Sequence, residues 1–234
     1  MDRSSDVRLD SASGRGTDID LEGQLGLERS KSVARLGGYF WFNSRHRMDF
    51  SLYDLSRDGV VPIQETIRFG RRVFEIDTRI ESEADFTVLK GDYTFAPLSK
   101  PRGFLGVSAG LYVARTKYAL REPTLGVTES EDLTAPLPVL GLRGNFRAND
   151  RITLEGAAQW FRWDSEDVDG RLHDVYIGAD YRFSRRGAVG LAYNDVSSTL
   201  RATEPGGFQG ELGFGYDGWL VYFKFEFPRP DTAR

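Results

Sequence analysis

Two histidines are the side chains of this sequence best suited to proton transfer. His173 is followed directly by Asp174, and the next segment of the chain carries further candidates for a relay: Asp195, Ser197 and Ser198. In such a relay a carboxylate orients the imidazole, and the imidazole takes the proton of a serine. Neighbouring residues of a strand point to opposite faces, so Asp174 cannot orient His173 if this segment is a strand. His46 lies at a tight turn far from these groups, and we therefore expect no catalytic site.

Acidic residues gather in two polar stretches of the chain. They are Asp18, Asp20 and Glu22 in the first stretch, and Glu129, Glu131 and Asp132 in the second. Carboxylate oxygens are the ligands that divalent cations prefer. Neither stretch has the spacing of a calcium-binding loop, so solvated acidic loops are the preferred interpretation. We expect neither a metal nor a cofactor.

The composition excludes several classes of protein. The chain has 234 residues, no cysteine, and a formal net charge of −4 from 31 basic and 35 acidic residues. Without cysteine there is no disulfide, thiolate zinc site or cysteine nucleophile. The balanced charge provides no basic surface for nucleic acid, so no nucleic-acid partner is expected. No run approaches the ~20 apolar residues that a membrane helix needs.

A period of two organises most of the chain. In the stretch from Trp219 to Phe227, Lys224 and Glu226 lie on one face and five apolar side chains on the other: Trp219, Val221, Phe223, Phe225 and Phe227. Such alternation predicts a β-strand with one apolar face. Similar alternation predicts strands in these further segments: 6–10, 33–43, 46–55, 86–95, 104–117, 137–148, 151–163, 172–183, 189–194 and 208–216.

The connections between these strands alternate in length. The short ones are 43–45, 97–102, 149–150 and 184–187, and the long ones are 11–32, 57–72, 118–132, 164–171 and 201–207. Short turns on one rim and long loops on the other are typical of outer-membrane barrels, whereas a soluble barrel, the alternative, has less reason to sort its loops. We predict an all-β fold: one antiparallel up-and-down transmembrane β-barrel over residues 1–227, with about ten strands (alternatively 8 or 12), short periplasmic turns and long extracellular loops. Residues 228–234 form a tail.

The final strand poses a difficulty. An even number of strands requires an upward strand before 33–43, and only 6–10 can supply it. The last strand then spans about 208–227 and pairs with 6–10, but its apolar phase slips by one between Tyr216 and Trp219. Either Asp217-Gly218 is a bulge in one long strand or it is a turn that changes the count.

The faces opposite the apolar ones carry eight acids and eight bases. These predicted lumen charges are Asp6, Asp10, Asp49, Asp92, Glu155, Asp174, Asp180, Glu226, Arg8, Arg35, Arg47, Lys90, Arg143, Arg147, Arg182 and Lys224. Charges so balanced in a narrow lumen either pair with one another or simply solvate the interior. An ion-selective pore would instead show a bias of sign.

Aromatic residues recur near the ends of the predicted strands. Those expected to form two belts at the membrane–water interfaces are Phe95, Trp160, Trp163, Phe183, Tyr193 and Phe225. In a soluble protein the same residues would form a core.

Together with the alternating strands and the sorted loops, the terminal Tyr222-Phe223-Lys224-Phe225-Glu226-Phe227 resembles the small bacterial outer-membrane β-barrels of the broad outer-membrane-protein A and W type. The resemblance implies insertion by the barrel-assembly machinery, which in that class recognises a final strand ending in an aromatic residue. Pro228 to Arg234 follow Phe227 here and depart from that pattern. The start, Met-Asp-Arg-Ser-Ser-Asp, lacks an apolar signal segment. Either the chain never leaves the cytoplasm or it is a mature form with an added Met1; we expect the mature form, located in the outer membrane of a Gram-negative bacterium.

The resemblance implies a location and no reaction, because several proteins of this class have no known activity. We expect a non-enzymatic barrel with a structural, adhesive or surface-interaction role, embedded in outer-membrane lipid, whose long loops could bind a partner. One alternative is a narrow, porin-like passive channel for small solutes, suggested by the polar lumen. The other is a lipid-modifying enzyme using His173, although no His-x-Ser pair of the deacylase or phospholipase kind is present.

Overall fold

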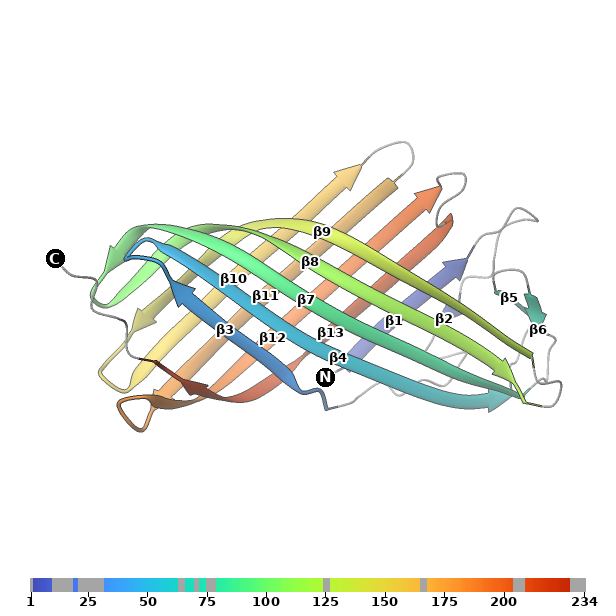
Figure 1. Cartoon of the computed structure of the whole chain (residues 1–234), viewed down its shortest axis with the longest axis horizontal. Coiled ribbons are helices and arrows are strands. Elements are labelled where there is room, and N and C mark those ends of the chain that lie inside the picture. The colour runs from blue at the N-terminus through green and yellow to red at the C-terminus, as the bar shows by residue number, and fades with distance from the viewer. Residues whose placement is uncertain are drawn as a thin grey trace.

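The chain forms antiparallel strands joined in sequence order, and the main sheet curls round into a barrel (Figure 1). This architecture comes from a computed structural model that describes residues 2–9, 19–20, 32–62, 66–69, 72–74, 79–123, 127–164, 168–203 and 209–227. The predicted all-β, up-and-down fold is confirmed. Within these described ranges, no helix is long and apolar enough to cross a membrane.

Ten strands of seven or more residues make up the main sheet, together with the two-residue strand β2, which agrees with the predicted count of about ten. The strands of this sheet are β1 (Asp2–Leu9), β2 (Ile19–Asp20), β3 (Arg35–Trp41), β4 (His46–Pro62), β7 (Arg79–Lys100), β8 (Gly103–Glu122), β9 (Val127–Arg147), β10 (Ile152–Asp164), β11 (Val168–Arg182), β12 (Gly187–Thr203) and β13 (Gln209–Phe225). A separate hairpin consists of β5 (Ile67–Phe69) and β6 (Arg72–Phe74).

The first and last strands pair, but only over one half of the barrel. The sheet order is β2-β1-β13-β12-β11-β10-β9-β8-β7-β4-β3. β1 pairs with β13 from Asp2 opposite Asp217 to Leu9 opposite Gly210. This half lies toward the long connections, at what we call the long-loop end; the opposite, short-turn end carries the tight turns. Toward the short-turn end, no described strand lies between β3 and residues 218–225 of β13, which leaves a lateral seam.

Several strands run further toward the long-loop end than the sequence indicated. β8 continues to Glu122 and β9 begins at Val127, within the segment 118–132 that was predicted to be a loop. Likewise β4 extends to Pro62. The outward positions of these extensions are mostly polar, so the apolar outer face by which the strands were recognised stops before the strands do.

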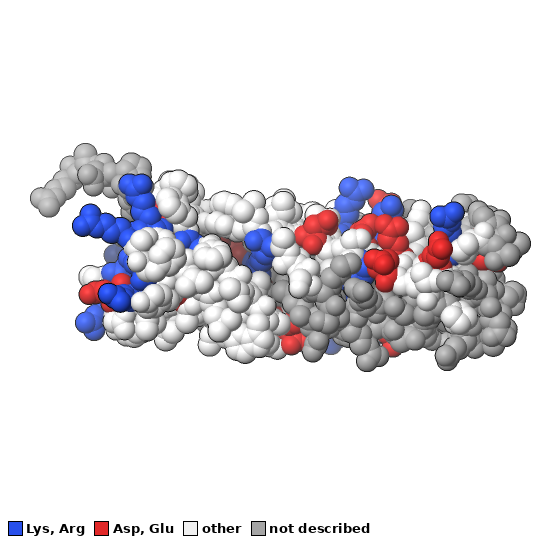
Figure 2. Space-filling view, turned by 90° about the horizontal axis from the view of Figure 1, so that it is seen from below, with Lys and Arg blue, Asp and Glu red and all other residues white. Residues whose placement is uncertain are grey.

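Along each long strand, the apolar residues change from the outer face to the inner face, and the polar residues change the other way. On β8, the exposed outward residues include Leu105, Val107 and Leu111 near the short-turn end and Arg115, Lys117 and Arg121 toward the long-loop end. The same reversal occurs on β4, where outward Leu52 is followed by outward Asp54. The outer surface therefore has an apolar band toward the short-turn end and charges beyond it, and Figure 2 shows a sparsely charged area between the basic side chains at the left and the mixed charges farther right.

The inner face reverses in the opposite sense. Toward the long-loop end the interior is a packed apolar cluster of buried residues: Tyr53, Val88, Tyr112, Ala114, Ala135, Leu137, Val139 and Leu172, with Phe161, Leu200 and Tyr216 against it. Nearer the short-turn end the inward positions hold small or charged groups, such as Gly106, Ser108 and Lys90. The hydrophobic core thus fills one half of the lumen, and a polar interior fills the other.

This reversal explains the phase slip in the last strand. β13 is continuous from Gln209 to Phe225, and its register with β12 runs without a break through Asp217 and Gly218, so neither a bulge nor a turn is present. Tyr216 points inward to Tyr53, whereas Trp219 is 69% exposed on the outer face. The apolar residues change faces because the strand passes from the core half to the apolar-band half.

Two phenylalanines of β13 test this assignment. The Phe214 ring lies 6.3 Å from the Phe86 ring inside the barrel, so Phe214→Ala should lower the free energy of unfolding by about 3 kcal/mol. Phe223 is 84% exposed on the outer face, so Phe223→Ala should lower it by much less. Urea unfolding of the detergent-folded protein, followed by tryptophan fluorescence, measures both. A loss at Phe214 no larger than that at Phe223 would mean that the faces do not exchange as described.

Candidate functional site

An ion-paired network crosses the middle of the lumen. Lys90 on β7 contacts two carboxylates, with its Nζ 2.7 Å from Asp174 Oδ2 on β11 and 3.4 Å from Asp92 Oδ2. All three side chains are almost completely buried. A buried charge is tolerated only when it is paired and hydrogen-bonded, so the position of each of these groups depends on the others.

Asp174 accepts hydrogen bonds from side chains on three other strands. Besides Lys90, it accepts hydrogen bonds from the Tyr112 hydroxyl and from Asn194 Nδ2, the latter at 2.6 Å. Asn194 in turn accepts a bond of 2.9 Å from Arg35 Nη1, and this bond joins β12 to β3 across the lumen. Asn194 and the Asp174 carboxylate therefore connect β3, an edge strand of the sheet, to β12 and β11 through side chains alone.

Asp92 is the second centre of the network. It accepts bonds from Gln159 Nε2 at 2.7 Å and from Arg143 Nη2 at 3.3 Å. Gly110 makes room for it, because a Cβ at this position would collide with the Asp92 carboxylate. The network continues through Arg143 to Asp49, with Nη1 3.7 Å from Oδ1, and Asp49 also binds Arg47 at 2.5 Å. Three acids thus face three bases in this layer.

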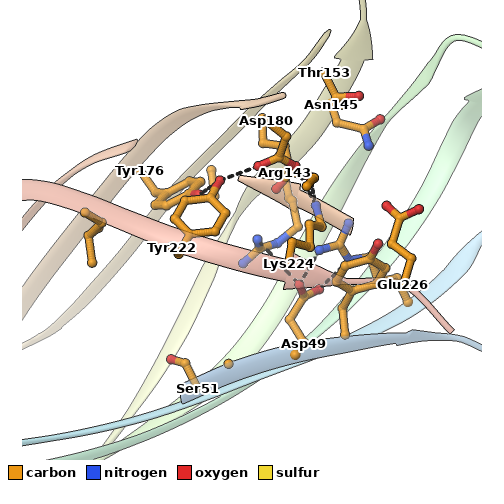
Figure 3. A pocket seen from close by; sticks show the side chains of 18 of the residues that line it. Asp49, Ser51, Arg143, Asn145, Thr153, Tyr176, Asp180, Tyr222, Lys224 and Glu226 are labelled. Carbon is orange, nitrogen blue, oxygen red and sulfur yellow. Dashed lines mark hydrogen bonds and ion pairs between the residues drawn. The ribbon is translucent and has the colours of Figure 1, made fainter. Parts of the chain in front are cut away.

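A second cluster lies nearer the short-turn end (Figure 3). Lys224 Nζ on β13 lies 2.6 Å from Glu155 Oε1 and 2.7 Å from Asp180 Oδ2. The Tyr222 hydroxyl donates to Asp180 Oδ1 at 2.6 Å and accepts from the Tyr176 hydroxyl at 3.0 Å. Arg182 and Glu226 form a separate ion pair of 3.1 Å at the rim. This cluster holds three acids and two bases, and each acid lies within 3.1 Å of a basic nitrogen.

These two clusters line a cavity of about 1300 Å³. The cavity extends to the short-turn rim near Arg102 and Arg147, and to the seam, where Tyr39 of β3 and Phe223 of β13 line it. Figure 3 shows the labelled side chains of Tyr222, Lys224 and Asp180 around it. The cavity therefore occupies the polar half of the lumen, toward the short-turn end.

Aromatic side chains close the other half. The hydroxyls of Tyr53 and Tyr216 lie 2.6 Å apart across the lumen, from β4 to β13. Burial raises the pKa of the Tyr216 hydroxyl well above its usual value, and the neighbouring Tyr53 raises it further, so Tyr216 stays protonated. Beyond this pair, Arg57 is buried with its guanidinium 5.4 Å from the centre of the Phe86 ring. On the long-loop side of the cavity, side chains thus occlude the lumen.

The predicted lumen charges take the following places. Arg47, Asp49, Lys90, Asp92, Asp174 and Asp180 are buried, and Arg35, Arg143, Glu155, Arg182, Lys224 and Glu226 are partly buried. Arg147 is exposed at the short-turn rim. The side chains of Asp6 and Arg8, and the whole of Asp10, lie outside the described residues. Sequence reasoning missed the neutral partners Asn194, Gln159 and Tyr112, although their inward positions in the alternation could have indicated them.

The predicted belt aromatics do not all share the outer face. Phe95, Trp160, Phe183 and Phe225 are exposed there, between 37% and 61%, and Tyr193 is partly covered by its bond to Asp217 and by the Trp219 ring. Trp163 is the exception. It is an odd number of residues from Trp160 on the same strand, so it projects from the opposite face of β10, where the strand ends at the long-loop rim.

The two histidines lie on the outer surface. His173 Nε2 is 3.1 Å from Asp195 Oδ1, and both side chains are about half exposed. Ser197 is the cross-strand neighbour of His173, but Ser198 and Asp174 are buried on the other face. His46 sits near the short-turn end beside the Tyr93 hydroxyl. An imidazole and a carboxylate therefore meet at the edge of the apolar band, outside the lumen network.

The two acidic stretches are described only in part. Asp132 faces Arg115 at 3.7 Å on the outer surface, with both side chains two-thirds exposed. Asp18 and Glu22, and the side chains of Glu129 and Glu131, lie outside the described residues. Among the residues that are described, no group of three acidic or histidine side chains is placed to hold a metal ion.

Comparison with known proteins identifies a fold. No protein-family model matches the chain, and no curated protein matches it. Among solved structures, it is similar to the outer membrane protease OmpT from Escherichia coli, with a TM-score of 0.55 and 11% sequence identity, over 97% of this chain and 93% of that one. At this identity the likeness shows a shared barrel fold and carries no residue roles. The predicted resemblance to the outer-membrane-protein A and W type is therefore supported only at the level of an outer-membrane β-barrel fold.

Removal of Asp92 tests the lumen network. Asp92→Ala leaves Lys90 and Arg143 each with one carboxylate fewer in a buried layer, so the free energy of unfolding should fall by about 3–5 kcal/mol. Asp132→Ala breaks an exposed pair and should cost less than about 1 kcal/mol. Urea unfolding in the same detergent compares the two variants. Equal losses would show that the buried carboxylate is not a structural centre.

Proposed function

We propose that the protein is an integral β-barrel of the bacterial outer membrane with a non-enzymatic, structural or surface-interaction role. The observation that carries the proposal is the outward apolar band. The outward-facing apolar positions span 105–113, 152–160, 175–183 and 219–227, each about 9 residues, which is the length that a tilted transmembrane strand needs. The barrel fold shared with OmpT, an outer membrane protease, supports the same location.

The interior supports a structural role over a channel. The buried layer pairs three bases with three acids, and the Tyr53–Tyr216 pair lies directly beyond it; the bases are Arg47, Lys90 and Arg143, and the acids are Asp49, Asp92 and Asp174. A conducting pore needs a continuous wet path, whereas here the cavity ends against packed side chains. In this proposal the charges of the lumen hold the strands together and move no solute.

The same interior gives little support to catalysis. The buried carboxylates are engaged by basic or amide groups, so none is placed as a lone acid or base. The His173–Asp195 pair is the feature that favours the lipid-modifying alternative, because it sits on the outer surface next to the apolar band. It lacks a serine hydrogen-bonded to the imidazole among the described contacts, and we therefore retain the non-enzymatic role.

Membrane insertion is tested by a charge placed in the band. Ala109→Arg puts a cation at the centre of the outward band and should cost about 2–4 kcal/mol in the bilayer, so less protein should fold into phosphatidylcholine vesicles. Thr134→Arg, outward beyond the band, should fold like the wild type. The folded fraction is measured by heat-modifiable migration on a detergent gel. Indistinguishable behaviour of the two variants, or a wild-type monomer folded in plain buffer, would contradict the proposal.

The closed lumen is tested in planar bilayers. Wild-type protein should give no steady conductance, whereas Tyr53→Ala/Tyr216→Ala, which removes the aromatic pair above the cavity, should admit ions. Heat-modifiable migration confirms that the double variant is folded. Steady conductance of the wild type would support the channel instead. Hydrolysis of peptides or phospholipids that disappears in His173→Ala would support an enzyme.

A further inference from the structure

The short-turn end carries a rim of basic side chains. Seven of them, here called the basic rim, come from the four tight turns and their flanking residues: Arg45, Lys100, Arg102, Arg147, Arg151, Arg185 and Arg186. The structure describes these turns completely, over 43–46, 96–103, 147–152 and 183–187, and the single acid in them is Asp150. The whole chain, by contrast, has a net charge of −4. Positive charge is therefore concentrated at this end.

The basic rim is available to a ligand. All seven side chains are exposed, and none forms an ion pair within the described part of the chain. Figure 2 shows Lys and Arg gathered at this end of the barrel, with little acidic surface among them. At the long-loop end, by contrast, outward cations stand beside acids, as Arg115 does beside Asp132 and Arg201 beside Glu211. Acidic side chains thus neutralise outward bases at the long-loop end, whereas the described bases of the basic rim have no such acidic partner.

On the outer face, a layer of aromatic side chains lies next to the basic rim, on the side toward the middle of the barrel. The exposed outward rings nearest this end are Phe42 (57%), Phe95 (37%), Phe146 (54%), Phe183 (61%) and Phe227 (81%). Aromatic residues mark the level of the lipid headgroups around membrane barrels. The bases follow these rings within a few residues, as Arg45 follows Phe42 and Arg185 follows Phe183. The basic side chains therefore reach the depth at which phospholipid phosphates lie.

We infer that the basic rim binds the headgroups of anionic phospholipids in the leaflet around the short-turn end. The inference rests on the proposed membrane location. Every one of the four turns contributes at least one base, so the charge is distributed around the barrel, as a surrounding leaflet requires. A single protein partner would be matched better by a patch on one side. Each cation near an anionic headgroup contributes attraction that salt screens.

The test uses the wild-type barrel reconstituted in phosphatidylcholine vesicles that contain a trace of spin-labelled phosphatidylglycerol or spin-labelled phosphatidylcholine. Electron spin resonance gives the relative association of the two labelled lipids with the protein. We expect a preference of about fivefold for phosphatidylglycerol at about 20 mM NaCl, falling toward one at about 500 mM NaCl.

Two charge-matched variants locate the effect. Arg45→Gln/Lys100→Gln/Arg147→Gln/Arg185→Gln removes one base from each turn and should abolish most of the preference. Lys117→Gln/Arg121→Gln/Arg162→Gln/Arg171→Gln removes four outward cations near the long-loop end and should retain it. None of the four rim side chains takes part in a hydrogen bond within the described structure, so the rim variant should fold.

The outcomes separate the two proposals. Insertion into the vesicles with no preference for phosphatidylglycerol in the wild type, or an equal loss in both variants, would overturn the lipid site and leave the membrane location standing. Salt-sensitive binding of purified peptidoglycan without a lipid preference would likewise overturn it and assign the rim to the cell wall. Failure of the wild type to insert at all would overturn both.

Discussion

The outer face of this barrel changes its surroundings partway along each strand, and the rest of the structure follows from that constraint. In the apolar band, outward residues such as Val107 and Val221 leave the polar groups no place but the lumen. Beyond the band, outward positions such as Arg115 are polar, and the apolar residues turn inward to form the core. A strand has only two faces, so its apolar residues must lie on the outer face within the band and on the inner face beyond it. The strands β4, β8 and β13 all show this change.

The lumen network is the consequence for the polar half. Charges that cannot face the apolar band must point inward, where a buried charge is costly unless a partner meets it. Lys90, Asp92 and Asp174 solve this by pairing across strands that are far apart in the chain. The bond from Arg35 to Asn194 has a further effect, because it ties β3 to β12 on opposite sides of the seam, where no backbone pairing is present among the described residues. Side chains thus supply part of the closure that backbone pairing supplies elsewhere.

Alternation in the sequence was sufficient to predict the fold and the faces within the apolar band. Val107 and Leu142 stand out as outward residues because small or polar neighbours flank them. The strand extensions beyond Lys117 were missed because their outer face is polar, as the surface of a loop would be. The same exchange made Tyr216 and Trp219 appear out of phase, and assigning Trp163 and Trp160 to one surface ignored their odd spacing.

The pairs within the lumen were harder to predict than its polarity. Parity indicates that Lys90 and Asp174 both point inward, but whether they meet depends on the stagger between β7 and β11, which a single sequence does not specify. Asn194 and Gln159 complete the network without any charge, so counting charges could not reveal them.

The exchange of faces is measured most directly on β8, because the chain has no cysteine and single spin labels can be placed at will. Labels at 105, 107, 109, 111 and 113 in the vesicle-bound barrel should collide with oxygen, and labels at 115, 117 and 121 with a water-soluble nickel chelate. The predicted result is that the preferred collision reagent changes from oxygen to the nickel chelate between positions 113 and 115. Uniform exposure to the chelate along the whole series, or protection of these outward positions from both reagents, would contradict the account.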